Sequence, residues 1–466
     1  MTATEIVIPR EAYDDEKFEK AFQAVLQMDK KDYPSYIGGL MVASGVEYRI
    51  NSPIDDSIMF GRFQEPEVGT TEKAVDSSLA VFGEWSKTAV SERIQTMEKV
   101  LESLCLQRYR FAAIVLISTG MTRQEALKEV DDLIEIISSQ IGAVEAVSGK
   151  PMGAWAIITA HNSPLASPIG YAVAAILAGN TVVLMPSKYC PLPVYCAYDL
   201  FVRAGLPDGV MDIIVDCKDE TPMELANDSR LAGVVVSGSG NNLEDMMFLQ
   251  VDDELAFINE LKGMNPVLVY RPADMKKAVR DLLDSAFRYN GQHLFSVSKA
   301  IVTVDEQKKF IDELLDQVKD LKITDPAEKD AFSGPMISVE NKRLFDKILG
   351  GVADCVVCGG KAIVSEFTNA GVYVTPAVIT GVDDESDVAF MDFGLPLLYV
   401  KVVADIEEAF EEMAYTECGM SAGVFTKDQS LMNRFKEESN LPILFFNKSS
   451  NTLAPGLFAK VENFVR

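Results

Sequence analysis

The chain has 466 residues, of which 48% are hydrophobic and 24% are charged. This composition is typical of a globular protein, and the length corresponds to two or three domains at about 150 residues each. The formal net charge of −27 argues against nucleic acid and against an anionic membrane surface as partners, because both are bound by clustered Lys and Arg.

The seven cysteines are scattered through the sequence, which is typical of a reducing compartment and not of a disulfide framework. The first residues lack the basic and apolar segments of a secretion signal. Residues 152–187 carry no Asp, Glu, Lys or Arg, but Pro164, Pro168 and Asn180 interrupt the segment. We therefore interpret it as buried strands and a helix, and we expect a cytoplasmic protein that does not bind a membrane.

Helical and strand patterns alternate along the chain, which predicts an α/β fold with mostly parallel sheets. The early segments favour helices at residues 72–85, 91–106 and 123–139, the last with Thr122 as its N-cap. Next come predicted strands at 155–159, 181–185, 210–215 and 233–237, with helices at 168–178 and 195–204. After Gly263 the alternation restarts with strands at 266–270 and 300–304 and helices at 275–287 and 306–318.

Several short motifs, taken in order, resemble those of the aldehyde dehydrogenase superfamily. A-H-N-S-P at residues 160–164 resembles P-W-N-x-P, and residues 177–184 resemble the start of L-A-x-G-N-x-V-x-x-K-P-S. Residues 204–210 match A-G-L-P-x-G-V, and residues 260–266 resemble E-L-G-G-K-x-P. Residues 289–294 resemble N-x-G-Q-x-C, while 371–378 and 393–394 resemble G-x-x-x-x-P-T-V and part of E-x-F-G-P. Their order and spacing carry the resemblance.

The resemblance implies an aldehyde dehydrogenase-like fold with two Rossmann-like parallel α/β domains. We expect a nucleotide-binding-type domain over residues 1–255 and a catalytic-type domain over residues 256–440. A short tail over residues 441–466 is expected to return to the first domain or to an interface.

The family's reaction needs a cysteine thiolate that attacks the aldehyde, an asparagine amide that holds the oxyanion, and a glutamate that activates water. By the resemblance, Asn162 falls on the asparagine and Glu260 falls on the glutamate. Leu294 falls on the nucleophilic cysteine, and no cysteine lies between Cys217 and Cys355. A leucine forms no covalent bond to a carbonyl, so we expect the family's oxidation to be absent.

The positions that bind the nucleotide in the family also differ here. Met185 and Lys188 replace the lysine and glutamate of K-P-S-E, and Leu243 replaces the last glycine of the pyrophosphate loop. Met391 replaces the ribose-binding glutamate of E-x-F-G-P. The family-like residues that remain are Ser187, Gly238 and Ser239. We therefore expect NAD(P) binding to be lost or weak, and we assign no cofactor.

The segment that forms the family's oligomerisation flap is short. Only a remnant near residues 140–151 remains before the strand at 155–159, and the tail after Asn447 is short as well. In the family a C-terminal strand of another subunit pairs with this flap. We therefore expect the usual dimer sheet to be missing or remodelled. The sequence leaves open whether another oligomer replaces it.

The two histidines, His161 and His293, both map beside the ancestral active site. One interpretation is a new polar site, with Asn162 and Glu260, for a ligand, a metal or a proton. The other is that each imidazole fills space left by a lost substrate tunnel. Glu260 is either a relic or a partner of Lys262, and the spacing supports no metal assignment.

These features favour a catalytically inactive member that acts as a scaffold, a regulatory subunit or a ligand-binding protein, with a protein or a small molecule as its partner. Two alternatives remain. The first is different chemistry in the same cleft, with His293 or Glu260 as base. The second is a residual NAD(P)-dependent oxidoreductase acting on aldehydes.

Overall fold

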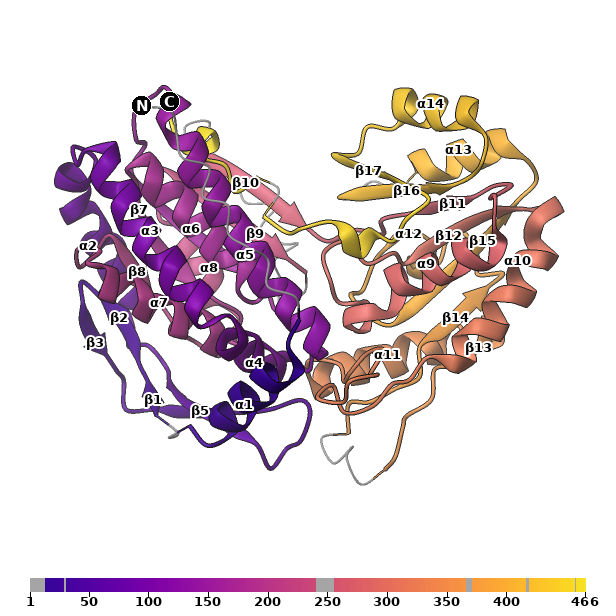
Figure 1. Cartoon of the computed structure of the whole chain (residues 1–466), viewed down its shortest axis with the longest axis horizontal. Coiled ribbons are helices and arrows are strands. Elements are labelled where there is room, and N and C mark those ends of the chain that lie inside the picture. Colours follow the sequence, from indigo (N-terminus) through magenta and orange to yellow (C-terminus); the bar gives the residue numbers. More distant parts are fainter. Residues whose placement is uncertain (1–12, 29–30, 240–254, 366–370, 416–418, 457) are drawn as a thin grey trace.

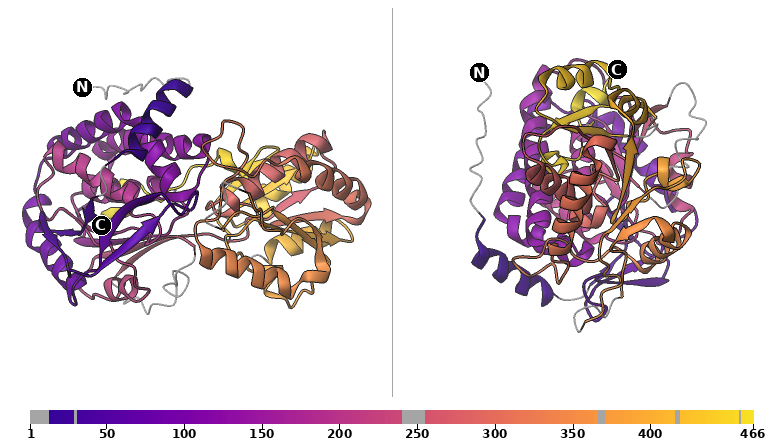
Figure 2. Two further views of the ribbon diagram at one scale, coloured as in Figure 1. Left: turned by 90° about the horizontal axis from the view of Figure 1, so that it is seen from below. Right: turned by 90° about the vertical axis from the view of Figure 1, so that its right-hand side faces the viewer.

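The computed structural model describes residues 13–28, 31–239, 255–365, 371–415, 419–456 and 458–466. Two seven-stranded sheets, each packed against helices, form two domains that lie side by side (Figures 1 and 2). The predicted α/β fold with two Rossmann-like units is thereby confirmed.

The first sheet has the strand order β10-β9-β6-β7-β8-β2-β3. Its parallel strands are β10 (Ala256–Leu261), β9 (Gly233–Gly238), β6 (Ala154–Thr159), β7 (Thr181–Met185) and β8 (Met211–Ile213). Strands β2 (Ser35–Ile37) and β3 (Leu40–Val42) continue one edge in antiparallel pairing. Since β10 pairs with β9, the predicted domain boundary at residues 255/256 lies before the last strand of this sheet.

The helices of the first domain include the three expected before the sheet, and α5 begins with the expected Thr122 cap in a capping box with Glu125. These helices are α1 (Asp15–Leu26), α2 (Thr70–Trp85), α3 (Val90–Leu106), α4 (Arg108–Thr119), α5 (Arg123–Ala143), α6 (Ala166–Ala178), α7 (Leu192–Ala204) and α8 (Thr221–Ala226). A small separate sheet contains β1 (Asp32–Tyr33), β5 (Met59–Gln64) and β4 (Glu47–Asn51).

The second sheet has the order β13-β14-β15-β12-β11-β16-β17, and all its pairs are parallel except β13 with β14. Its strands are β11 (Val267–Val269), β12 (Lys299–Thr303), β13 (Val356–Cys358), β14 (Ala377–Thr380), β15 (Leu397–Val403), β16 (Ser421–Phe425) and β17 (Ile443–Phe446). Its helices are α9 (Met275–Phe287), α10 (Val304–Gln317), α11 (Val339–Gly351), α12 (Asp387–Phe390), α13 (Ile406–Ala414) and α14 (Gln429–Glu438).

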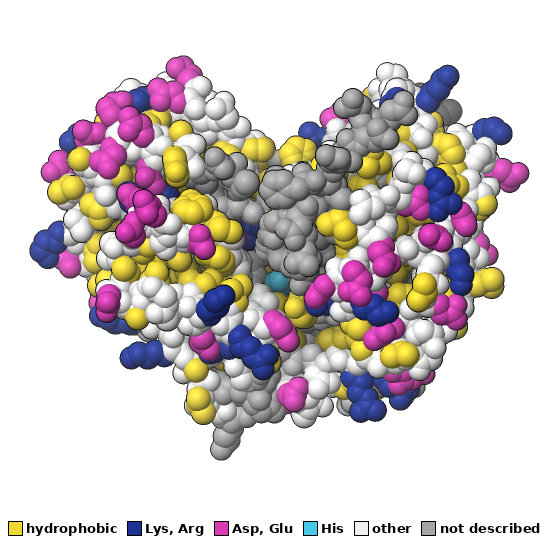
Figure 3. Space-filling model, turned by 180° about the vertical axis from the view of Figure 1, so that it is seen from behind, with side chains coloured by type: hydrophobic (Ala, Val, Ile, Leu, Met, Phe, Trp, Pro, Cys, Tyr) yellow, Lys and Arg dark blue, Asp and Glu magenta, His cyan; other side chains and the backbone are white. Residues whose placement is uncertain are grey.

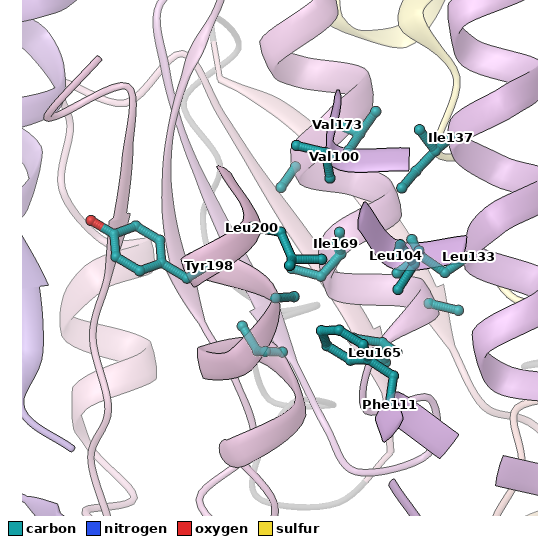
Figure 4. Packing of buried hydrophobic residues seen from close by; sticks show 14 of the residues in the cluster. Val100, Leu104, Phe111, Leu133, Ile137, Leu165, Ile169, Val173, Tyr198 and Leu200 are labelled. Atoms are coloured by element: carbon teal, nitrogen blue, oxygen red, sulfur yellow. The ribbon is translucent and has the colours of Figure 1, made fainter. Parts of the chain in front are cut away.

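The largest hydrophobic core lies among the helices of the first domain. Side chains of α3, α4, α5, α6 and α7 meet there, as Figure 4 shows for Leu104, Phe111, Leu133, Ile169 and Leu200. Every residue of β6, β7 and α6 is buried, so the uncharged segment noted in the sequence is a core and not a membrane span. None of the described helices combines the length and the apolar composition that crossing a bilayer requires.

The segment predicted to be a flap remnant contains no strand. Helix α5 runs to Ala143, a 3-10 turn (Val144–Ala146) follows, and Pro151 forms an isolated antiparallel bridge with Val465. The backbone N–H of Lys150 donates to the Arg466 carbonyl at 2.8 Å, and the reverse bond measures 3.0 Å. The last residues of the tail therefore contact the first domain of their own chain, which is one of the two alternatives expected for them. Strand β17, which lies earlier in the tail, belongs to the second sheet. Loss of the dimer sheet stays a prediction.

Candidate functional site

The predicted site residues lie where strands β6, β9 and β10 end, together with the segment that follows α9. Ligands of open α/β sheets bind at such carboxyl edges, because loops and helix N-termini gather there. The surface is notched where the two domains meet, and a histidine side chain is visible near that junction (Figure 3).

Asn162 lies in the turn between β6 and α6 and is 1% exposed. Its Oδ1 accepts the backbone N–H of Ser239 at 2.9 Å. Its Nδ2 donates to Ser239 Oγ at 3.1 Å and to the carbonyl oxygen of Gln292. A carboxamide nitrogen has two hydrogens, so both donors are already used inside the protein. This amide has no free donor for an oxyanion.

Leu294 is fully buried in a small apolar cluster with Phe295 and Met420. Ile443, Leu453 and Phe458 pack against the same cluster. The Leu294 side chain is therefore packed among hydrocarbon side chains, while its backbone carbonyl accepts a hydrogen bond from Asn265 Nδ2 at 2.9 Å.

The segment that leads to Leu294 has strained backbone. Tyr289 and Asn290 both have positive φ, 54° and 55°, which costs a non-glycine residue about 1 kcal/mol or more. The strain is offset by hydrogen bonds from their backbone N–H groups to Glu125 Oε1 at 2.8 Å and to Ser333 Oγ at 3.0 Å. Because Glu125 belongs to α5, the first bond joins the two domains.

Glu260 is fully buried within β10. Its Oε2 accepts hydrogen bonds from Ser167 at 3.1 Å and from Ser237 at 2.9 Å, and the two serine oxygens are 2.6 Å apart. Burial, followed by the charge of Glu260, raises the pKa of the neighbouring Tyr171. The carboxylate is thus tied to α6 and β9 by hydroxyl groups.

Lys262 forms an ion pair with Asp392. Lys262 Nζ lies 2.5 Å from Asp392 Oδ2, and the two side chains are 0% and 3% exposed. Burial lowers the pKa of Lys262, and the charge of Asp392 opposes that shift. The sequence signal was present, since Lys262 stands at a glycine of the E-L-G-G motif and Asp392 follows Met391.

His161 is 6% exposed, and neither of its ring nitrogens has a hydrogen-bond partner. It lines a cavity of about 10 Å³ together with Asn162, Tyr289, Gln292 and side chains of both domains. That volume holds about one water molecule. Burial lowers the pKa of His161 to about 4, so the ring is neutral at neutral pH.

His293 stacks on Tyr289 with ring centres 4.5 Å apart, and its Nδ1 accepts the Phe295 backbone N–H at 3.4 Å. Burial, with help from Lys128 and Lys262, lowers its pKa to about 3. Tyr289 therefore lies between His293 and the cavity of His161. The described residues include no group of three metal-type ligands, and Glu260 accepts hydrogen bonds from Ser167 and Ser237.

Only some of the predicted nucleotide-binding residues lie together in the structure. Met185, Ser187 and Lys188 line a cavity of about 30 Å³ at the ends of β6 and β7. Lys188 Nζ is paired with Asp219 Oδ1 at 2.6 Å. Met391 lies in the second domain and is 46% exposed, while Leu243 lies outside the described residues.

Gly238 is a position where only glycine fits. Its φ is 118°, and a Cβ there would lie 2.4 Å from the Cβ of Ala160. Ser239 follows directly and binds Asn162 through both its backbone N–H and its hydroxyl. This close approach of β9 to the turn after β6 is what fixes the asparagine.

The family model for the aldehyde dehydrogenase family matches residues 42–459. The chain belongs to the aldehyde dehydrogenase family. A 1-pyrroline-5-carboxylate dehydrogenase of Geobacillus sp. (strain WCH70) is 25% identical over 460 residues, which cover 92% of this chain and 88% of the relative. The α-ketoglutarate semialdehyde dehydrogenase of Haloferax volcanii is 27% identical over 441 residues, with 90% and 91% covered.

Solved aldehyde dehydrogenase structures share the fold. A variant of the Thermus thermophilus 1-pyrroline-5-carboxylate dehydrogenase superposes with a TM-score of 0.90 at 20% identity, over 99% of this chain and 98% of that one. Betaine aldehyde dehydrogenase of Staphylococcus aureus, solved in complex with NAD+, gives 0.85 at 22% identity, with 93% and 90% covered.

Proposed function

We propose that this chain is a non-catalytic member of the aldehyde dehydrogenase family, acting as a scaffold, a regulatory subunit or a ligand-binding protein. The observation that carries the proposal is Leu294, fully buried among hydrocarbon side chains at the position that the family's motif gives to the nucleophile. Without a thiolate there is no covalent adduct from which hydride could leave.

The neighbouring groups support the same conclusion. Both N–H donors of the Asn162 amide bind inside the protein, to Ser239 and Gln292, so stabilising an oxyanion would require breaking these bonds first. Glu260 is held by Ser167 and Ser237. An active site for this chemistry needs free donors and a free base, and here both are engaged.

The residues present do not fit NAD(P). Lys188 is already neutralised by Asp219, and the cavity beside it measures about 30 Å³, whereas ligand pockets usually measure about 300 Å³ or more. Asp392, the residue that follows Met391, is engaged in a buried ion pair with Lys262. We therefore derive no step through a nicotinamide cofactor.

Aldehyde oxidation is the competing function, and the observation that favours it is similarity over about nine-tenths of the chain to relatives named as dehydrogenases. That reaction needs a reactive thiol. Cys190 is buried in the first domain, and burial raises its pKa to about 12, so it is a neutral thiol at neutral pH. Cys196 is disfavoured in the same way, since burial raises its pKa to about 11.

The test uses the full chain with NAD+ or NADP+, a panel of aldehydes, and 1-pyrroline-5-carboxylate, a cyclic imine that opens to an aldehyde on hydrolysis and is the compound in the names of several relatives. We expect no nicotinamide reduction and no acyl adduct by mass spectrometry. Turnover by the unmodified chain would refute the proposal.

The Leu294→Cys variant separates the loss of the nucleophile from the loss of nucleotide binding. Leu294→Ala is the matched control, because it opens space without adding a thiol. We expect Leu294→Cys alone to remain inactive. Adding Met185→Lys, Lys188→Glu, Leu243→Gly and Met391→Glu restores the family's nucleotide residues, and any recovered turnover should require this combination. Full activity from Leu294→Cys alone would contradict the loss of nucleotide binding.

A further inference from the structure

The turn between β2 and β3 lies at the opposite edge of the first sheet from the site, since β6, β7 and β8 separate it from β9 and β10 (Figure 1). Gly38 and Gly39 form this turn with φ of 57° and 75°. Two successive residues with positive φ are typical of a tight two-residue hairpin. The turn packs against the start of β8, where the backbone N–H of Gly38 donates to Asp212 Oδ1 at 2.8 Å.

Asp212 is a buried carboxylate whose charge has no basic partner. Its side chain is fully buried, and Oδ2 makes no hydrogen bond. Among the described residues, no Lys or Arg forms an ion pair with Asp212 or with its neighbour Asp208. A buried, unpaired negative charge is strongly unfavourable, so the site lacks a positive charge that would complete it.

Other oxygen atoms gather at the same turn. A Cβ built on Gly39 would lie 2.5 Å and 2.7 Å from the two carboxylate oxygens of Asp208. A Cβ on Gly38 would lie 3.2 Å from Ser77 Oγ, and one on Gly209 would lie 3.1 Å from the same atom. Two carboxylates and a hydroxyl group therefore surround a turn that has no side chains of its own. Asp208 is exposed, which leaves the cluster open to solvent.

We propose that Asp208, Asp212 and Ser77 form a binding site for a hard divalent cation, with Ca²⁺ as the fitting ion, which ties the β2–β3 turn to the start of β8. Carboxylate and hydroxyl oxygens are the ligands such cations prefer. Ser77 lies in α2, Asp208 lies in the turn before β8 and Asp212 lies in β8, so the three ligands come from separate elements and their geometry is irregular. Ca²⁺ accepts irregular coordination, whereas Mg²⁺ demands a regular octahedron.

A proton on Asp212 is the simplest rival. Burial raises the pKa of Asp212 to about 6, against the opposing influence of Ser77 and of the Gly38 amide. At pH 7.5 most molecules would still carry the charge, so a proton alone does not neutralise the site under ordinary conditions. The cation and the proton predict opposite results for an asparagine substitution.

Calcium binding to the chelator-treated full chain is measured at pH 7.5 by isothermal titration calorimetry, with Mg²⁺ in a parallel titration. We expect one Ca²⁺ per chain and a rise of about 2 °C or more in the midpoint of thermal unfolding at saturating Ca²⁺. Asp212→Asn and Asp208→Asn should each weaken binding at least tenfold. Asp199→Asn, which changes an exposed acid paired with Arg203, is the control and should bind as the unmodified chain does.

Terbium provides an independent readout, because an excited tyrosine transfers energy to a nearby Tb³⁺ ion. The charges of Asp212 and Asp208 both act on the hydroxyl of Tyr198, which points away from the other labelled core side chains in Figure 4. We expect tyrosine-sensitised Tb³⁺ emission that Ca²⁺ displaces, and Tyr198→Phe should reduce the emission without changing Ca²⁺ affinity. The proposal is overturned if no stoichiometric Ca²⁺ binding occurs, if the Asp variants bind normally, or if Asp212→Asn raises stability while the unmodified chain ignores Ca²⁺.

Discussion

Lys262 and Asp392 form a buried ion pair between the end of the first sheet and a loop of the second domain, with 2.5 Å between Nζ and Oδ2. The residues are 130 positions apart in sequence, and they stand close to Glu260 and Met391, two positions singled out by the sequence motifs. The pair therefore joins the two domains beside the candidate site.

Substituting only one member of this ion pair should destabilise the protein more than substituting both members. Lys262→Met leaves the Asp392 charge buried and uncompensated, and we expect a loss of about 3–5 kcal/mol in the free energy of unfolding. The double variant Lys262→Met/Asp392→Leu should recover most of that loss. Denaturant unfolding of the single and double variants measures both values. Lys73→Met is the control, since Lys73 and Glu67 are 54% and 52% exposed and should contribute less than about 1 kcal/mol. Equal losses in both pairs would contradict the burial argument.

Acidification should destabilise the fold through His161. Its pKa is lowered to about 4 by burial, so between pH 6.5 and 4 the unfolded chain binds a proton that the folded chain does not. Stability is unaffected above pH 6.5 and falls as the pH drops through this window. At pH 5 we expect the unmodified chain to have lost about 2 kcal/mol more, relative to pH 7, than His161→Gln. Urea unfolding at the two pH values measures the difference, and parallel pH profiles would show that His161 is not responsible.

Two glycines at helix ends should respond differently to the same substitution. Gly179 and Gly205 end α6 and α7 with φ of 96° and 92°. Alanine should cost about 1–2 kcal/mol at either position because of the left-handed backbone. At Gly179 the new Cβ would also lie 2.0 Å from Arg93 Nη1 and 2.8 Å from Pro151 Cγ, whereas nothing lies within 4 Å at Gly205. We expect Gly179→Ala to cost about 2 kcal/mol more, measured by thermal or denaturant unfolding. Equal costs would mean that Arg93 moves aside freely.

The N-terminus of α6 depends on a carboxylate from α5. Glu129 Oε1 accepts the backbone N–H groups of Leu165 at 3.0 Å and Ala166 at 2.8 Å, and the hydroxyl of Ser163 at 2.8 Å. Glu129→Ala leaves these buried donors without a partner, and we expect a loss of about 3 kcal/mol or more. Glu129→Gln keeps an acceptor and should recover part of it. Amide hydrogen exchange at Leu165 and Ala166 provides the local readout, and unchanged protection in Glu129→Ala would contradict this role.

Most secondary structure followed from local patterns. Thr122 indicated the start of α5, and the residues that end α6 and α7 are Gly179 and Gly205. Helix α4 was not predicted, because its described residues from Phe111 to Thr119 are all buried and the sequence shows no amphipathic period there. The domain boundary after residue 255 stays a prediction; β10 and β11 are consecutive strands, and only strand pairing shows that they belong to different sheets.

Asn162, Glu260 and Leu294 were assigned to the candidate site by motif position, and these assignments stay predictions. The hydrogen bonds of these residues could not be predicted from the sequence. The commitment of the Asn162 amide to Ser239 and Gln292 was not visible, since the partners lie 77 and 130 residues away. The same holds for the serines that bind Glu260.

The sequence by itself determined the fold class and the identity of the side chain at each motif position, because hydrophobic period, helix caps and motif spacing are properties of neighbouring residues. Only the tertiary structure decided which buried polar groups meet, as with Lys262 and Asp392, or remain alone, as with the Asp212 oxygen and the His161 ring. The physical reason is that desolvation and pairing depend on distances of a few ångströms between residues far apart in the chain, and no local pattern encodes those distances.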